Sequence, residues 1–96
     1  MNQLPPIENL RCFVAVAEEL DFRKAAAHLK ITESALSTRM QKLEDLLGAQ
    51  LCARGSSTET RLTPAGRVLL ADARALLQSI GKMVDTARGL AAAGAR

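Results

Sequence analysis

Apolar residues recur at helical spacing in three successive stretches at the start of the chain. The first stretch predicts a helix over residues 7–19, with its apolar side at Ile7, Leu10, Phe13, Val14 and Ala17. Asp21 then has the character of an N-cap, and the next apolar stripe consists of Phe22, Ala25, Ala26 and Leu29. Thr32 caps a third predicted helix, which ends at Gly48 and whose inner side is Leu36, Met40, Leu43 and Leu47.

The pattern changes after Gly48. Two short segments, residues 51–54 and 60–63, flank the turn-forming residues 55–58 and predict a small two-stranded hairpin. Thr63 followed by Pro64 is typical of an N-cap and a first helical position, so a long helix is expected from 64 to about 92. The fold class is therefore mainly α.

The long helix carries a heptad seam, because its apolar residues alternate between spacings of four and three. The seam consists of Leu69, Ala73, Leu76, Ile80, Met83, Ala87 and Leu90, and a second row beside it of Leu70, Leu77, Val84 and Ala91. We expect one side of this helix to lie on the small domain and the other to meet a second copy of the chain. The alternative is a helix that packs wholly within its own chain.

The composition suits packed helices and excludes several classes of protein. Of 96 residues, 48% are hydrophobic, but only Phe13 and Phe22 are aromatic. Residues 23–67 carry eight basic and four acidic side chains, whereas residues 1–22 have a net charge of −3, so the middle of the chain favours a polyanionic partner. The longest apolar run, residues 12–17, is too short to span a membrane. We therefore expect a cytoplasmic protein without a membrane partner.

Enzymatic and metal chemistry lack the residues they need. Cys12, Cys52 and the single His28 fit no metal-ligand spacing, so neither a metal nor a cofactor is expected. No glycine-rich phosphate loop and no nucleophile with a neighbouring base are present, which argues against an enzyme. Cys12 is interpreted as a buried thiol. A redox role for Cys52 is an alternative with no support in the sequence.

The order of helix, helix, short turn, helix and hairpin is that of a winged helix-turn-helix, and residues 22–41 fit the helix-turn-helix pattern. Lys30 stands where that turn often takes glycine, which is unfavourable if its φ is positive. The sequence resembles the LysR-type transcriptional regulators from residue 7 to about 90. The matching segments are Leu10, FVAVAE (13–18), FRKAA (22–26), LKITESALS (29–37), LE (43–44), LG (47–48), LCAR (51–54) and RLTPAG (61–66).

The resemblance implies a division of the chain and a set of partners. Residues 1–63 would be the winged helix-turn-helix, 64–92 a linker and dimerisation helix, and 93–96 the start of a hinge or tail. Members of this family continue into an effector domain, which this sequence lacks and through which alone a small-molecule effector would act. They dimerise through antiparallel linker helices, often form tetramers, and bind inverted repeats in double-stranded DNA. The expected dimer seam is Leu69, Ala73, Leu76, Ile80, Met83 and Ala87.

By the same resemblance, the third helix lies in the major groove and its outward residues read bases. These residues are Glu33, Ser34, Ser37 and Thr38. Two of them depart from the family, in which glutamine is common at Glu33 and arginine at Thr38. Arg39, one position later, is a candidate to compensate for that arginine, although a shift of one residue rotates it by about 100° around the helix. Glu33 has an alternative role as a favourable charge in the first helical turn.

Phosphate or groove contacts are expected from the basic side chains around the third helix, and from its capping residue. These candidates are Arg23, Lys24, Thr32, Arg39, Lys42, Arg54 and Arg61. For each cation the alternative is an ordinary solvated charge, and Thr32 has the alternative of a cap alone. The wing, residues 53–62, lacks the arginine that is common at its tip and carries Glu59, so we expect weak anchoring in the minor groove.

Two rival interpretations remain at this point. In the first, the winged helix is a scaffold for protein interactions and the long helix an assembly device. The basic middle and the polar face of the third helix disfavour it. In the second, the chain is the related N-terminal domain of a molybdate-responsive regulator.

Overall fold

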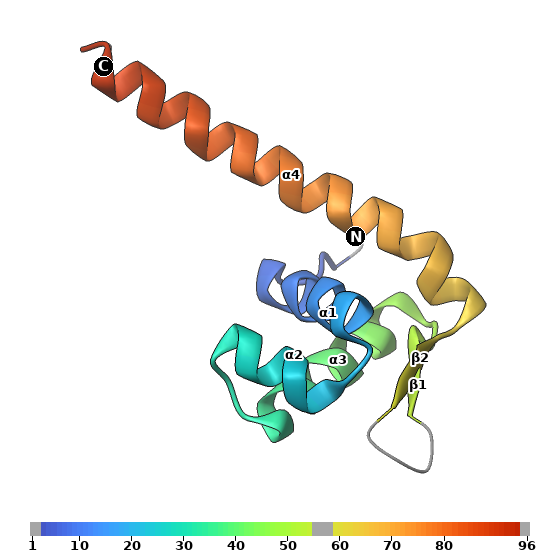
Figure 1. The fold of residues 1–96 in the computed structure, drawn as a ribbon. Helices are drawn as coiled ribbons and strands as arrows, with labels where there is room; N and C mark the ends of the chain where they lie inside the picture. The colour runs from blue at the N-terminus through green and yellow to red at the C-terminus, as the bar shows by residue number, and fades with distance from the viewer. Residues whose placement is uncertain (1–2, 55–58, 95–96) are drawn as a thin grey trace.

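The computed structural model describes residues 3–54 and 59–94. Its elements follow in the order α1 (Ile7–Glu19), α2 (Phe22–Leu29), α3 (Glu33–Leu47), β1 (Cys52–Arg54), β2 (Thr60–Leu62) and α4 (Pro64–Ala92). The first three helices pack together under one half of α4, and the hairpin projects from the same body (Figure 1). The predicted class, a mainly α winged helix-turn-helix followed by a long helix, is confirmed.

Helix α1 lies at the centre of the core, because α2, α3 and α4 all pack against it. Its buried residues include Cys12, Phe13, Ala15 and Val16, so its apolar surface is wider than one stripe. Two predicted core positions are wrong. Ile7 is 48% exposed because it lies at the open end of α1, and Leu47 is 41% exposed.

The helix ends follow local side-chain chemistry. The predicted caps are confirmed, since Asp21, Thr32 and Thr63 each accept a hydrogen bond from the backbone N–H three residues later. Lys30 ends α2 with a φ of 60°, the unfavourable conformation that the missing glycine implied. Leu20 ends α1 in the same left-handed region, with a φ of 53°.

The wing is a two-stranded antiparallel hairpin in which Ala53 stands opposite Arg61. The predicted turn at residues 55–58 lies outside the described residues. A contact that the sequence did not predict ties this hairpin to the turn between α1 and α2. The backbone N–H of Thr60 donates to the carbonyl of Leu20 at 3.1 Å, and Asp21 forms an isolated bridge with Glu59. The wing is therefore held to this turn through its second strand.

Helix α4 divides into a covered and an uncovered half. Leu70, Ala73 and Leu77 pack against the core of the domain, with Ala73 only 3% exposed. The assignment of Ala73 to a dimer seam is therefore wrong, because its own chain already covers it. Residues 81–94 are exposed along their whole length. Among the described helices, α4 included, none is sufficiently long and apolar to cross a bilayer.

The wing and α4 meet at Leu51, whose side chain is fully buried. Its carbonyl accepts a hydrogen bond from the N–H of Thr63 at 2.9 Å. Gly66, in the first turn of α4, lies directly over that carbonyl, and a Cβ on Gly66 would stand 2.1 Å from the oxygen. Only glycine therefore allows α4 to start so close to the strand.

The close approach predicts that Gly66→Ala destabilises the chain by about 2–4 kcal/mol, because the methyl group meets backbone that cannot move aside. Gly81→Ala is the matched control, since nothing lies within 4 Å of that position in the same helix. It should be neutral or stabilise by up to about 1 kcal/mol. Chemical denaturation of both variants measures the difference, and equal stabilities would contradict the packing described above.

Candidate nucleic-acid interface

The outward face of α3 is polar over its first two turns. Glu33, Ser34 and Thr38 are exposed and Ser37 is half-buried. The opposite side of the helix is fixed by Leu36, Met40 and Leu43, which are all nearly inaccessible. The core therefore orients α3 so that these four predicted base-reading residues are turned away from it.

The start of α3 is rigidly defined. The Oγ1 of Thr32 accepts the backbone N–H of Ala35 at 3.0 Å, so the capping role of Thr32 is confirmed. One turn after Thr38, Gln41 is exposed, and its Nε2 donates to Asp45 Oδ1 at 2.9 Å. This face of α3 therefore offers hydroxyl, carboxylate and amide groups to a binding partner.

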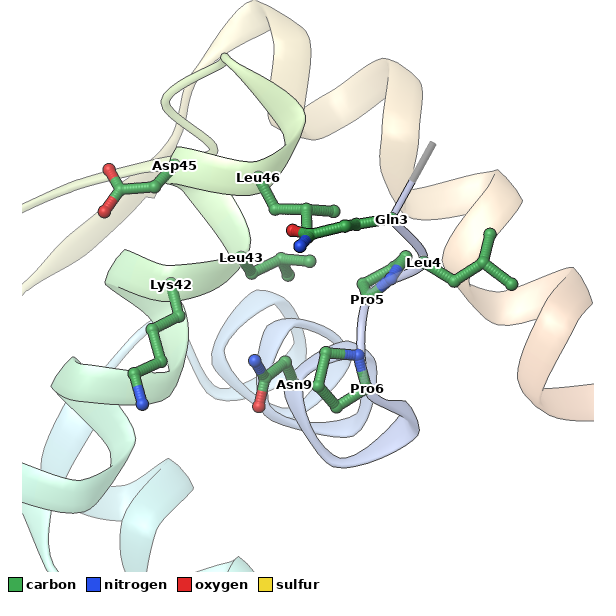
Figure 2. A pocket seen from close by; sticks show the side chains of 9 residues that line it. All are labelled: Gln3, Leu4, Pro5, Pro6, Asn9, Lys42, Leu43, Asp45 and Leu46. Carbon is green, nitrogen blue, oxygen red and sulfur yellow. The ribbon is translucent and has the colours of Figure 1, made fainter. Parts of the chain in front are cut away.

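Exposed cations lie on α2, α3 and the wing. Arg23 and Lys24 are exposed on α2, and Arg61 is exposed on β2. Lys42 extends from α3 beside an open groove between that helix and the N-terminal segment (Figure 2). The sequence-predicted cations on α2, the wing and Lys42 are therefore available to solvent.

Arg39 is placed differently from the other predicted contacts. It is half-buried between α3 and α1, with its Nη1 3.9 Å from Glu8 Oε2. The same side chain hydrogen-bonds the Cys12 thiol. Arg39 therefore takes part in the contact between α3 and α1, and its contact with DNA stays a prediction.

Arg54 is oriented by an aromatic ring. Its guanidinium carbon lies 3.7 Å from the centroid of the Phe22 ring, a cation–π contact between the end of β1 and the start of α2. Sequence reasoning identified Arg54 as a contact but did not connect it with Phe22. The two residues are far apart in the sequence, and no local pattern links them.

The position of the wing relative to α3 depends on Glu44, which sequence reasoning also missed. Its Oε2 accepts the backbone N–H groups of Leu51 and Cys52, at 2.7 and 3.2 Å. Charge-assisted bonds of this kind are stronger than neutral ones. Glu44 thereby joins the last turn of α3 to the first strand of the wing.

The two cysteines are buried and free, as expected for Cys12. Burial raises the pKa of the Cys12 thiol, and the hydrogen bond and charge of Arg39 oppose that rise. Burial, together with the charge of Glu44, raises the pKa of Cys52 to about 12. Thiolate chemistry at Cys52 is therefore disfavoured at neutral pH. Across residues 3–54 and 59–94, no three His, Cys, Asp or Glu side chains gather as metal ligands would.

Known proteins share both the sequence and the fold. The family model described as "Bacterial regulatory helix-turn-helix protein, lysR family" matches residues 7–67. The HTH-type transcriptional regulator YnfL of Escherichia coli, itself described as uncharacterized, is 48% identical over 81 residues, or 84% of this chain. The chain spans only 26% of the length of that relative.

Two solved structures have a fold similar to that of this chain. A mutant of OxyR from Corynebacterium glutamicum superposes with a TM-score of 0.86 at 36% identity, over 93% of this chain and 28% of the other. The complex of BenM_DBD with catB site 1 DNA superposes with a TM-score of 0.83 at 41% identity, over 90% of this chain and 96% of the other. The second superposition covers nearly the whole BenM_DBD chain, whose structure was solved in complex with DNA.

The bonds of Glu44 predict that Glu44→Ala destabilises the chain by about 2 kcal/mol, because two backbone N–H groups lose their acceptor. Glu44→Gln keeps an acceptor oxygen and should cost about half as much. The amide protons of Leu51 and Cys52 should exchange faster in Glu44→Ala. Asp45→Ala, which removes the neighbouring carboxylate of α3, is the control and should leave both amides protected. Unchanged exchange in Glu44→Ala would contradict the anchoring role.

Proposed function

The chain belongs to the LysR family of bacterial helix-turn-helix transcriptional regulators, and we propose that it binds a specific site in double-stranded DNA as a homodimer. In this proposal α3 enters the major groove, the wing lies along the neighbouring minor groove, and two copies occupy an inverted repeat. The observation that carries it is the polar, outward-turned start of α3. The likeness to the BenM_DBD complex with DNA supports the same docking.

Each exposed residue receives a role under this proposal. Base edges would be read by Glu33, Ser34, Ser37 and Thr38, whose hydroxyl and carboxylate groups are available on α3. Phosphates would be contacted by Arg23, Lys24, Thr32, Lys42, Arg54 and Arg61. Arg39, whose side chain is 36% exposed beside Glu8, would be a further phosphate contact.

The dimer would form on the uncovered side of α4. Leu76 and Met83 are 53% and 67% exposed, an unusual condition for large apolar side chains in regular helical register. Ile80 and Ala87 continue the same seam, and Leu69 borders it where α4 reaches the domain. An antiparallel pairing of two such helices would cover these side chains.

The whole protein would extend beyond this chain, because relatives such as YnfL are about three times longer. We propose that an effector domain follows residues 93–96, that it binds the small-molecule effector, and that it supports assembly into tetramers. Since the family regulates transcription, its place of action would be the cytoplasm, where the bacterial chromosome lies.

The test of DNA binding is its salt dependence. If several phosphates are neutralised, the logarithm of the affinity should fall linearly with the logarithm of the salt concentration, by a slope of about 0.9 per phosphate. Lys42→Ala and Arg54→Ala should each make the slope shallower by about that amount. Lys82→Ala, which removes the same charge from the far half of α4, should leave it unchanged. Affinity that does not depend on salt would favour the protein-interaction scaffold over DNA binding.

Base reading at Glu33 is tested by Glu33→Gln. Glutamine can pair bidentately with adenine, whereas a carboxylate only accepts hydrogen bonds, for example from cytosine. Removing the charge should raise the general affinity and shift preference away from cytosine at one position of each half-site, by about 1–3 kcal/mol. Selection from randomised half-sites measures this shift. Identical preferences, with a stability loss of only a few tenths of a kcal/mol, would assign Glu33 to the helix dipole instead.

The seam predicts that Met83→Asp disrupts the dimer without unfolding the monomer, because this side chain is exposed in its own chain. Two buried carboxylates facing a closed interface should raise the dimer dissociation constant at least about 100-fold. Gln78→Asp, on the opposite side of α4, serves as the control and should remain dimeric. Sedimentation velocity distinguishes the species, and a Met83→Asp dimer would place the interface elsewhere.

A further inference from the structure

Arg54 and Phe22 form a unit that the proposed contacts do not explain. Arg54 ends β1 as an exposed side chain, and its guanidinium carbon lies 3.7 Å from the centroid of the Phe22 ring. Phe22 is only 7% exposed and belongs to the core. The ring is therefore fixed by the fold and offers one face to a charged side chain at the base of the wing.

A guanidinium group stacked on a ring keeps its hydrogen-bonding capacity. Its five N–H donors lie in the plane of the group and point outward from the edge, so covering one face leaves them free. Among the residues that the structure describes, no group accepts a hydrogen bond from Arg54 or pairs with its charge. The carboxylate of Asp21, which adjoins Phe22, accepts the backbone N–H of Lys24 instead. The ring thus orients Arg54, while its N–H groups have no acceptor among the described residues.

A fixed orientation of Arg54 matters for anion binding because the wing has few cations. Residues 52–62 contain only Arg54 and Arg61 as basic side chains. A free arginine loses rotamer freedom when it binds a phosphate, and a side chain already held in one orientation loses less. The stack therefore lowers the entropic cost of binding an anion beside the wing.

We propose that Phe22 is a positioning residue for DNA binding: its ring holds the Arg54 guanidinium so that the free edge faces a phosphate of the duplex beside the wing. This inference rests on the proposed function, because it requires the duplex to reach the wing. It adds a residue of the core that touches no DNA, and it requires the planar arginine rather than any positive charge.

The test compares two phenylalanine variants on a random-sequence DNA duplex at fixed salt, with the whole 96-residue chain. Phe22→Leu keeps an apolar filling but removes the ring face, and should weaken binding about three- to tenfold. Phe13→Leu is the matched control, because Phe13 is equally deep in the core and no cation lies over it in the part of the chain described. It should lower the melting temperature similarly and leave the affinity unchanged. Phe22→Tyr should restore most of the binding.

A second arm uses the exposed residue, whose substitution does not threaten folding. Arg54→Lys keeps the charge but loses the planar stack, and should weaken binding nearly as much as Arg54→Ala. In the pair Phe22→Leu and Arg54→Ala, the double variant should bind no more weakly than Arg54→Ala alone. Wild-type affinity of Arg54→Lys, additive losses in the double variant, or equal losses in the two leucine variants would each overturn the positioning role. Absence of salt-dependent binding by the unsubstituted chain would instead overturn the proposed function itself.

Discussion

Helix α3, the wing and α4 are joined through the backbone of one residue, Leu51. Its N–H is bound by Glu44 of α3, its carbonyl is bound by Thr63 ahead of α4, and its side chain is fully buried. Gly66 closes the arrangement by lying against the same carbonyl. Because α3, the wing and α4 all meet at this peptide group, none of them can be reoriented without breaking a buried contact.

The two sides of α3 differ in what they contact. The inner side of α3 is anchored by Leu36, which is inaccessible to solvent, whereas the outer side carries short hydroxyl residues that the core does not need. Such an arrangement lets the outward residues vary while the fold is retained. The wing is stabilised less by its own short strands than by backbone contacts to Leu20 and the Glu44 carboxylate.

The sequence predicts best those features that depend on neighbouring residues. The cap at Thr32 and the helix start at Pro64 were predictable because capping is a local interaction. The division of the long helix was not, since Ala73 and Met83 share one heptad seam although one is buried in its own chain and the other is exposed. Periodicity identifies an apolar side but not what covers it. Contacts made across many residues, such as those of Glu44, leave no local pattern at all.

The uncovered half of α4 gives the molecule a mechanical character. The helix has 29 residues, a length of about 43 Å, and rests on the domain only over its first half. A continuous helix bends little over such a span. The uncovered half therefore moves as one rigid piece about the contact of Ala73 with the core. A change of angle at this contact displaces the far end of the helix more than any residue near the contact, because the displacement grows with distance along a straight helix.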